Sequence, residues 1–346
     1  MCATGCAPWR GPDVSSQLAR VALRDVQRPV TAELDRVMDE LTRIVAADFS
    51  RIGEINTYLM KMRGKLFRPT LLLLANRATG GGDADSRIVT LAAVTELIHL
   101  ATLVHDDSVD HSALRRGMPT INALFSHQTA VIMGDYLYSR AIIELVRVGE
   151  LEPLRVFAGV TNDMSIGEMR QLEALDRLAF SQDDYDLLIR AKTASLVSGA
   201  CEVGALRAAP EHKEALRRYG LFLGMGFQVM DDVIDYTQSE AVTGKPSGLD
   251  LREHKVTLPL IAALSDGRLA AADRARVEAL MATSEPSDAQ VQEVIALVAA
   301  AGGIDAARQR AQDLARQAEA ELEGLPPSPA RDGLRDAIGY AVDRDS

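Results

Sequence analysis

The stretch VTLAAVTELIHLATLVHDDSVDHSALRRG, Val89–Gly117, joins a long apolar run to three aspartates and then to two arginines. The apolar run predicts a hydrophobic helix, and the aspartates fall where that helix ends. A second stretch, LFLGMGFQVMDDVIDYT, Leu221–Thr237, has the same organisation. Both contain the pattern D-D-x-x-D, first at Asp106, Asp107 and Asp110 and then at Asp231, Asp232 and Asp235. Two apolar helices that end in the same acidic pattern are the starting point for interpreting the chain.

Each pattern places two carboxylates on one face of a helix, because positions i and i+4 lie one turn apart. Asp106 and Asp110 therefore point together, as do Asp231 and Asp235, and their mutual repulsion lowers helix stability. Negative charge near a helix C-terminus also opposes the helix dipole. A divalent cation offsets both effects, and a ligand set made only of oxygen favours Mg²⁺ completed by water and phosphate. The repeated pattern thus predicts two facing acidic helix ends with Mg²⁺ and a phosphate group between them.

The composition of the chain favours an all-α fold. Of its 346 residues 47% are hydrophobic but only 4% are aromatic, so the core must consist mainly of Ala, Leu, Val, Ile and Met, which favour helix over sheet. Helical periodicity is clear in residues 30–46, 288–302 and 305–325, and no alternating pattern indicates a β-strand. We expect a flexible tail at residues 1–17 and one all-α domain of ten or more helices at residues 18–346.

Charge and cysteine usage argue against several classes of protein. The net charge is −11 and the sequence pI is about 5.1, which disfavours a nucleic-acid-binding surface. Three cysteines cannot form a disulfide framework and suit a reducing cytoplasm. The N-terminus lacks a signal peptide, and Glu96 and His99 interrupt the longest apolar segment, so we expect no transmembrane helix. A cytoplasmic protein follows, with contact to a membrane surface left open.

Short basic segments that contain Gly or Pro accompany the acidic patterns. They are GKLFRP with Lys65 and Arg68, RRG with Arg115 and Arg116, AKTASL with Lys192, and the segment from GKPSG to EHK with Lys245 and Lys255. A substrate that bears phosphate needs cations besides the metal, and Arg suits this role because its guanidinium can bind two oxygens at once. Each segment alone is more often a solvated charge, but together they predict two separate phosphate pockets.

The ordered set of motifs resembles the trans-isoprenyl diphosphate synthases, also called polyprenyl synthetases. The motifs are GKLFRP, ELIHLATLVHDDSVD with the RRG that follows, GDYL, GEMRQL, KTASL, FQVMDDVIDYT, GKPSGLDLREHKVTLPLI and a C-terminal YAVDRDS. They extend from about Leu34 to Arg344, and the full set in this order is far more specific than any one of them. The resemblance implies an all-α fold of the isoprenoid-synthase type around a deep central cavity, in a homodimer.

The resemblance also implies roles for individual residues. The six aspartates would bind Mg²⁺, three ions in each active site, bridging the diphosphate of an allylic substrate. Arg115, Lys192 and Lys245 would hold the same diphosphate with Lys255 nearby, and Lys65, Arg68, His99 and Arg116 would bind the diphosphate of isopentenyl diphosphate. Thr193 and Gln228 would lie beside the reacting carbons, where their dipoles stabilise positive charge. Glu168 and Gln171 are typical of the family, but the sequence indicates no physical role for them.

The implied reaction needs no protein nucleophile. Mg²⁺ neutralises the leaving diphosphate, and the allylic C–O bond ionises in a site that excludes water. The double bond of isopentenyl diphosphate attacks the cation, and the departing diphosphate takes up the proton that is lost. We therefore predict a prenyltransferase that adds isopentenyl units to an allylic primer in successive 1'-4 condensations, giving an all-trans polyprenyl diphosphate.

Small residues beneath the first acidic motif predict a long product. Thr102 lies one turn before Asp106 with Ala101 beside it, and in the family bulky aromatic residues at these positions stop growth early. One isoprene unit is about as long as one helical turn of about 5.4 Å, so Ile98 or Val94 would set a deeper floor. We expect a product of about C30–C50, with C35–C45 favoured. The alternative is that Ala101 and Thr102 only pack against a neighbouring helix.

Several other functions compete with this prediction. A short-chain synthase that makes farnesyl or geranylgeranyl diphosphate would share the motifs, whereas a terpene cyclase usually carries one DDxxD and a different second metal motif. A non-catalytic subunit of a heteromeric synthase usually lacks aspartates or basic ligands that are intact in this chain. An acidic helical scaffold would not explain why the basic residues fall where diphosphate ligands are needed.

Overall fold

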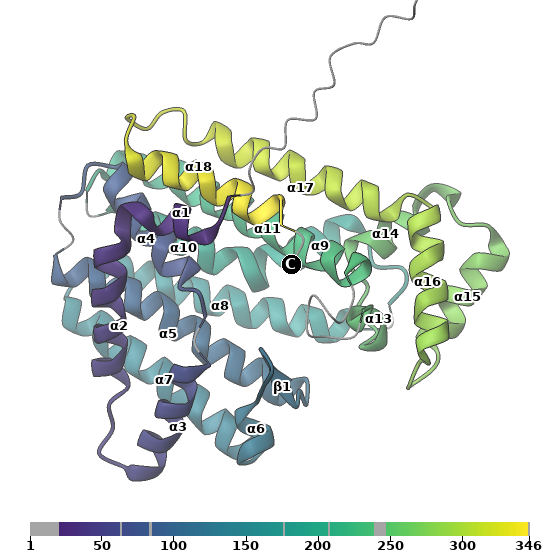
Figure 1. Cartoon of the computed structure of the whole chain (residues 1–346), viewed down its shortest axis with the longest axis horizontal. Helices are drawn as coiled ribbons and strands as arrows, with labels where there is room; N and C mark the ends of the chain where they lie inside the picture. Colours follow the sequence, from purple (N-terminus) through teal and green to yellow (C-terminus); the bar gives the residue numbers. More distant parts are fainter. Residues whose placement is uncertain are drawn as a thin grey trace, which may run out of the picture.

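The computed structural model describes residues 21–62, 64–82, 85–175, 177–206, 208–238 and 247–344. Figure 1 shows a bundle of long helices with a smaller lobe, formed by α15 and α16, at one end. The predicted tail and Lys245 lie outside the described residues. The α-helices are α1 Leu23–Gln27, α2 Thr31–Val45, α3 Ser50–Lys61, α4 Phe67–Ala78, α5 Ser86–Val109, α6 Ile121–Leu124, α7 His127–Val148, α8 Leu151–Ala174, α9 Gln182–Ile189, α10 Ser195–Leu206, α11 Lys213–Thr237, α13 Leu249–Arg252, α14 Leu258–Leu264, α15 Ala271–Met281, α16 Asp288–Ala300, α17 Gly303–Ala320 and α18 Pro329–Val342.

Short elements connect these helices. Three are 3₁₀ turns, η1 Arg28–Val30, η3 Pro210–His212 and η4 Ser265–Gly267, and one is a π-helical segment, η2 Arg190–Ala194. The predicted all-α fold is confirmed, with one small exception that the sequence did not predict. Strands β1 Leu114–Arg115 and β2 Met118–Pro119 form an antiparallel hairpin. The two turn residues, Arg116 and Gly117, both have positive φ, which matches the twist of a two-residue hairpin.

The periodic segments predicted from the sequence are helices in the structure. Residues 30–46 contain α2, whose buried face carries Leu34, Val37, Leu41 and Ile44. Residues 288–302 contain α16, which begins at a Ser287 capping box, and residues 305–325 contain most of α17. The three- and four-residue spacing of apolar side chains therefore identified the faces that pack inward.

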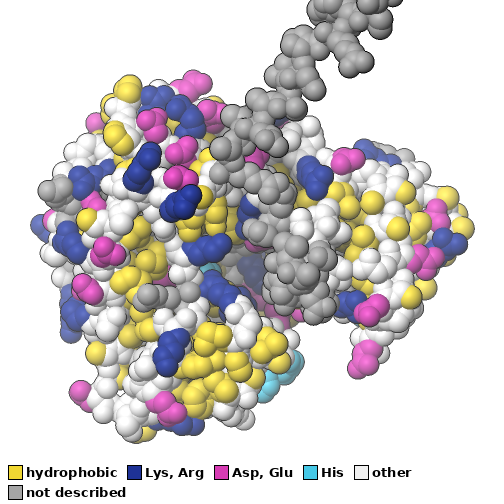
Figure 2. Space-filling model, viewed as in Figure 1, with side chains coloured by type: hydrophobic (Ala, Val, Ile, Leu, Met, Phe, Trp, Pro, Cys, Tyr) yellow, Lys and Arg dark blue, Asp and Glu magenta, His cyan; other side chains and the backbone are white. Residues whose placement is uncertain are grey.

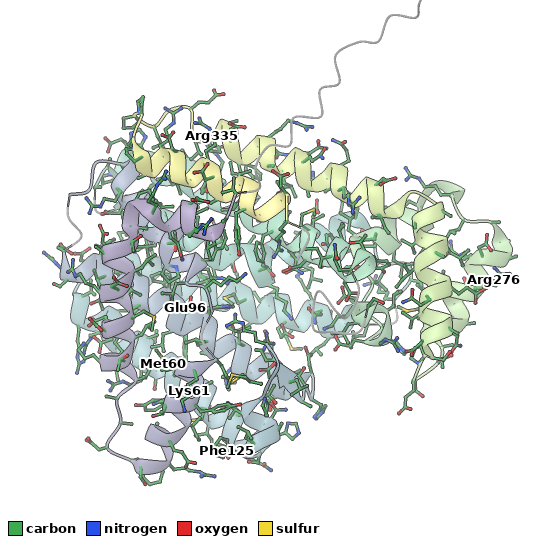
Figure 3. All side chains as sticks on the ribbon, in the orientation of Figure 1. Met60, Lys61, Glu96, Phe125, Arg276 and Arg335 are labelled. Carbon is green, nitrogen blue, oxygen red and sulfur yellow. The ribbon has the colours of Figure 1, made fainter. Side chains whose placement is uncertain are left out.

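Helix α5 is the central helix of the larger apolar core. It is long and apolar enough to cross a membrane by length and composition, but 72% of its most apolar window is buried inside the protein. Its nearest neighbours are α7, α2 and α4, and Figure 3 labels Glu96, which belongs to the middle of α5. The length and apolarity of α5 are thus accounted for by its place in the core.

Helix α11 joins two apolar cores. Its first half packs into the core that surrounds α5, and its second half packs into a core formed with α9, α14, α16 and α17. Glycines let it approach α10 and η2 closely. A Cβ at Gly220 would lie 2.7 Å from the carbonyl oxygen of Val197 on α10, and one at Gly224 would lie 2.7 Å from the Cα of Ala194 on η2. These contacts hold α11 against the segment that carries Lys192 and Thr193.

Candidate active site

The first acidic motif lies at the C-terminal end of α5, and its middle residue is buried. Asp107 is only 5% exposed and accepts hydrogen bonds from Nε of Arg115 at 2.8 and 2.9 Å. Nη2 of Arg115 also lies 2.7 Å from Oδ1 of Asp107, so the guanidinium binds the carboxylate at both oxygens. Asp106 and Asp110 are more exposed than Asp107. Burial raises the pKa of Asp106 to about 6, an effect that nearby Lys192 opposes.

The second acidic motif repeats this division. Asp232 is 4% exposed and accepts hydrogen bonds from the Tyr185 hydroxyl at 2.5 Å and from Nε2 of Gln228 at 2.9 Å. Burial raises the pKa of Asp232 to about 7, while the two donors lower it. Asp235 accepts the backbone N–H groups of Leu249 and Asp250 at 3.0 and 3.1 Å. In both motifs the middle aspartate is therefore tied to protein side chains.

Lys255 connects the two acidic motifs. Its Nζ atom lies 3.7 Å from Oδ2 of Asp110 in the first motif. Its backbone N–H donates to the carbonyl oxygen of Asp250, whose own N–H binds Asp235 of the second motif. Burial lowers the pKa of Lys255, but Glu253 and Asp110 raise it more, so the net shift is upward. The acidic ends of α5 and α11 thus face one recess, and Figure 2 shows acidic and basic side chains together in the hollow at the centre of its view.

Lys192 and Thr193 lie on the π-helical segment η2, an element that often marks functional sites. Nζ of Lys192 is 2.6 Å from Oε2 of Glu168 and donates to Oε1 of Gln171 at 2.8 Å. These contacts give the GEMRQL motif on α8 a physical role, which is to hold the Lys192 ammonium group. Helix α8 reaches η2 because Gly167 has no side chain, and a Cβ there would lie 2.5 Å from the backbone N of Lys192.

A second set of basic residues gathers where α4 begins. Nη1 of Arg68 lies 3.1 Å from Nε2 of His99, and Nη1 of Arg116 donates to the Met62 carbonyl at 2.8 Å. Burial, together with the charge of Arg68, lowers the pKa of His99 well below its usual value, so His99 is neutral at pH 7. The ring of Phe67, the residue before Arg68, stacks on Phe227 of α11 with 5.8 Å between the ring centres, which places the start of α4 close to the second acidic motif.

Lys65 is exposed in the short loop before α4, and the protein braces this loop at three carbonyl groups. Nε2 of Gln27 donates to the Lys65 carbonyl at 2.8 Å, and Oγ1 of Thr70 donates to the Leu66 carbonyl at 2.7 Å. Arg116 holds the third, that of Met62. Leu66 adopts a left-handed conformation with φ of 54°, which is uncommon for a residue with a side chain. The loop that presents Lys65 is therefore fixed by its neighbours.

A cavity of about 190 Å³ lies between α8, α9, η2 and α11. Its polar side carries Lys192, Asp232, Asp250 and Lys255, and its other walls are largely apolar. The lining residues are Gln171, Ala174, Leu175, Tyr185, Leu188, Ile189, Lys192, Thr193, Gln228, Asp232, Asp250, Lys255, Val256 and Thr257. A charged head group with an apolar chain matches this combination.

The predicted chain-length residues lie on α5 below the first motif. Ala101 and Ile98 are buried, with 3% and 1% exposure, and Val94 is fully buried. Thr102 is half-buried, and its hydroxyl donates to the carbonyl oxygen of His99 at 2.8 Å. Their role in setting product length stays a prediction.

Three residues of the site carried no predicted role. Tyr185 binds Asp232 from a different helix, and only its place two helical turns before Lys192 could have drawn attention to it. Burial, with Asp235 and Asp232 nearby, raises the pKa of Asp250 well above its usual value. Nη2 of Arg344 is 2.6 Å from Oδ1 of Asp231. Arg344 belongs to the C-terminal YAVDRDS motif, which pointed to the segment without giving this residue a function.

The donor set fits Mg²⁺ shared with a diphosphate. Among the described residues, no three His, Cys, Asp or Glu side chains are grouped so that they could hold a metal ion by themselves. Mg²⁺ commonly takes only one or two carboxylates from the protein and completes its shell with water and phosphate oxygens. Asp106 and Asp110 on one side of the recess, and Asp231 and Asp235 on the other, can supply such ligands.

The chain is similar to known proteins over most of its length. A family model described as polyprenyl synthetase matches residues 50–298. An all-trans-nonaprenyl-diphosphate synthase (geranyl-diphosphate specific) of Rhodobacter capsulatus is 36% identical over 93% of this chain and 98% of its own. Heptaprenyl diphosphate synthase component 2 of Geobacillus stearothermophilus is 37% identical over 90% and 96%. A crystal structure of a polyprenyl synthase from Caulobacter crescentus CB15, complexed with calcium and isoprenyl diphosphate, superposes with a TM-score of 0.89 at 33% identity, over 94% of this chain and 99% of the other.

Proposed function

The chain belongs to the polyprenyl synthetase family, and we propose that it joins isopentenyl diphosphate to an allylic diphosphate in the recess between α5 and α11. A prenyltransferase that makes long-chain all-trans polyprenyl diphosphates is the class that the family and its curated relatives support. The observation that carries the assignment of residues is the contact of Lys255 with Asp110, because it brings the two acidic motifs to one site. The reaction releases diphosphate at each addition.

Mg²⁺ is the metal that we assign to this site, with three ions in each active site. We assign the outer carboxylates, Asp106, Asp110, Asp231 and Asp235, as its ligands. Arg344 also contacts Asp231, and two backbone N–H groups also bind Asp235. Asp107 and Asp232 are buried and are held by protein side chains. When bound, Mg²⁺ would act as a Lewis acid that neutralises the leaving diphosphate. The middle aspartates support the site from behind, in the way that buried partners commonly orient metal ligands.

Two sets of cations receive the two diphosphates. Lys192 and Lys255 line the cavity, and together with Arg115 and Lys245 they form the set that we assign to the allylic diphosphate. Lys65, Arg68, His99 and Arg116 form the set for isopentenyl diphosphate, around the start of α4. A neutral His99 accepts from Arg68 and so orients the guanidinium without adding a competing charge. Arg115 holds Asp107 at the same time, so its contact with substrate depends on that ion pair.

Side chains beside the reacting carbons stabilise the allylic cation and exclude water. Thr193 and Gln228 line the cavity and present oxygen atoms to it. Leu188, Ile189 and Val256 form apolar parts of its wall, which protects a reactive cation from hydrolysis. The proton lost after the new carbon–carbon bond forms passes to the departing diphosphate, so no protein base is required.

A product of C35–C45 is the length that we favour. The names of the Rhodobacter and Geobacillus relatives correspond to the two ends of this range, which supports the proposal. Ala101 and Thr102 place no aromatic side chain of α5 beneath Asp106, so growth would continue towards Ile98 and Val94. The primer that starts the chain is a short allylic diphosphate.

We also propose that the enzyme is a cytoplasmic homodimer whose residues 18–346 act as one catalytic domain. Helices α7 and α8 expose large apolar side chains, among them Ile132 (61%), Val146 (62%) and Met169 (59%), which a second copy would cover. The sharing of α11 between both apolar cores favours one domain. No nucleic acid takes part, and release of a long apolar product would bring the enzyme to a membrane surface.

The direct test is incubation of the purified protein alone with Mg²⁺, labelled isopentenyl diphosphate and each allylic primer in turn. We expect extension to long products, and Asp231→Ala should remove most turnover. Arg335→Gln is a matched control, because Arg335 is a charged residue on α18 that binds Glu319 at 3.1 Å outside the site. A wild-type protein that extends no primer would overturn the assignment. Activity only after addition of a second protein would instead indicate a heteromeric synthase.

A further inference from the structure

We propose that Tyr185 is a positioning residue for prenyl transfer. Its phenol fixes Asp232, and Asp232 in turn fixes the Gln228 amide and the Thr193 hydroxyl. This inference rests on the proposed function and adds a residue outside both acidic motifs. The four side chains come from α9, η2 and α11, and hydrogen bonds connect them in one series.

The series of hydrogen bonds has a direction. The Tyr185 hydroxyl donates to Oδ2 of Asp232 at 2.5 Å, and Nε2 of Gln228 donates to Oδ1 at 2.9 Å. Each oxygen of the carboxylate therefore accepts one of the two donors. The amide nitrogen of Gln228 faces Asp232, and its oxygen Oε1 points away towards Thr193. Oγ1 of Thr193 then donates to that oxygen at 2.9 Å.

This direction decides what the cavity presents to a substrate. The single hydroxyl hydrogen of Thr193 is used by Gln228, so the lone pairs of Oγ1 remain for the cavity that both residues line. Oxygen lone pairs stabilise an allylic cation. If the Gln228 amide turned over, its NH₂ group would replace Oε1, and Thr193 would lose its acceptor. Asp232 therefore selects the amide orientation that suits the chemistry.

Burial makes Tyr185 necessary for this arrangement. Tyr185 is 1% exposed and Asp232 is 4% exposed, so little water is available to replace the phenol. Without the phenol, Oδ2 of this buried carboxylate would lack its donor, and the carboxylate would turn and draw the Gln228 amide out of position. Tyr185 itself is held in the second apolar core, where α9 packs beside α11. The phenol is thus a fixed donor from outside the helix that carries Asp232.

The test compares two allylic probes that differ in charge at the reacting carbon. One is an ammonium analogue of an allylic diphosphate, with nitrogen at the carbon that becomes cationic. The other is the uncharged allylic thiolodiphosphate. Both are titrated into the full-length protein with Mg²⁺ by calorimetry. Tyr185→Phe should weaken the ammonium analogue by about tenfold, the size expected for one lost charge-directed hydrogen bond, and should leave the thiolodiphosphate unchanged.

Tyr219→Phe is a matched control. Tyr219 is also fully buried, and its phenol donates to the Leu334 carbonyl at 2.7 Å away from the acidic motif. Tyr219→Phe should lower the melting temperature as much as Tyr185→Phe does. It should leave the ratio of the affinities for the ammonium analogue and the thiolodiphosphate at the wild-type value. The same ratio for Tyr185→Phe as for the wild type would overturn the inference.

Asp232→Asn gives a second route to the same comparison. Asparagine can accept from Tyr185 but turns an NH₂ group towards Gln228, so it should weaken binding of the ammonium analogue more than binding of the thiolodiphosphate. The double variant Tyr185→Phe/Asp232→Asn should lose little more than Asp232→Asn alone, because Tyr185 acts through Asp232. Additive losses would contradict the inference. A wild-type protein that binds neither probe would instead refute the proposed function, and this inference with it.

Discussion

Nη2 of Arg344 lies 2.6 Å from Oδ1 of Asp231, so a side chain from the C-terminal end of the protein binds the first residue of the second acidic motif. The guanidinium also lies 3.7 Å from the centre of the Phe227 ring, and Nη2 donates to the Phe227 carbonyl at 2.8 Å. Arg344 is 13% exposed at its side chain. If Mg²⁺ binds Asp231 as proposed, it must compete with Arg344 for the same carboxylate.

Arg344→Gln should consequently strengthen metal binding. We expect the Mg²⁺ concentration needed for half-maximal thermal stabilisation, at fixed inorganic diphosphate, to fall about fivefold, which corresponds to about 1 kcal/mol for a partly exposed ion pair with a cation–π contact. Without metal the variant should melt about 2 °C lower, because the contacts of Arg344 are lost. Arg335→Gln, at a residue labelled on α18 in Figure 3, should leave metal affinity unchanged. An unchanged or weaker affinity in Arg344→Gln would show that the two cations do not compete.

Metal affinity should depend on pH through Asp106, whose pKa burial raises to about 6. Mg²⁺ binds the ionised carboxylate, so affinity should rise as pH increases through about 6 and become constant above about 7. In the metal-free protein, the contribution of Asp106 to the free energy of unfolding should change with pH in the opposite direction to the metal affinity. Unfolded Asp106 loses its proton near 3.8, so between about pH 4 and 6 the folded state binds more protons and its stability falls as pH rises.

Calorimetric titration of Mg²⁺ alone between pH 5 and 8 measures the first trend. Asp106→Asn is the comparator, because it cannot ionise, and the step near pH 6 should be absent from its profile. A step that persists in this variant would assign the pH dependence to another group.

Gly167→Ala tests the close approach of α8 to the segment that carries Lys192. A Cβ would lie 2.5 Å from the backbone N of Lys192 and 2.8 Å from its Cα. Backbone atoms cannot relieve such a clash by a change of side-chain rotamer. We expect a loss of about 1–3 kcal/mol in the free energy of unfolding and a marked fall in turnover.

Gly159→Ala is the control on the same helix, where nothing lies within 4 Å of the added Cβ. It should stabilise the protein by about 0.5–1 kcal/mol through helix propensity and leave turnover unchanged. Chemical denaturation and steady-state kinetics measure both effects. If Gly167→Ala and Gly159→Ala had the same stability and turnover, η2 would be able to move away from the added Cβ without any effect on folding or activity.

Ala101→Tyr should shorten the product. A phenol beneath Asp106 would fill the space into which the chain is expected to grow, and Thr102→Phe should act in the same way from a half-buried position. Chromatography of the products should show a shift to short chains while incorporation of the first isopentenyl unit continues. An unchanged length distribution in both active variants would mean that the floor lies elsewhere.

The sequence predicted those parts of the site that depend on local spacing. The i, i+4 carboxylates, the apolar helices before them and the periodic faces of α2 and α16 all follow from helical geometry. The order of the motifs also indicated which basic residues belong to the site. These features need only neighbouring residues or a fixed sequence of segments.

Contacts between distant segments were not predictable in this way. Tyr185 and Asp232 are 47 positions apart and meet only because α9 packs beside α11. Arg115 reaches Asp107 because the chain turns back after α5, where His111 has positive φ and the Ser112 N–H donates to the Asp107 carbonyl, a conformation that no periodic pattern reveals. The part played by Glu168 likewise depends on the tight contact at Gly167. Spacing identified the acidic residues but could not indicate which of them are held by other side chains of the same chain.

The burial of Asp107 and Asp232 has a consequence for the resting enzyme. Each is fully engaged by side chains of the protein before any ligand arrives, so the ends of α5 and α11 hold their shape without metal. The conformational entropy of the acidic ends is therefore lost when the chain folds. Binding of Mg²⁺ does not have to order them, so their ordering does not reduce the affinity for the metal. A chelator should switch this catalyst off and magnesium should restore it within mixing time, with no refolding between the two states.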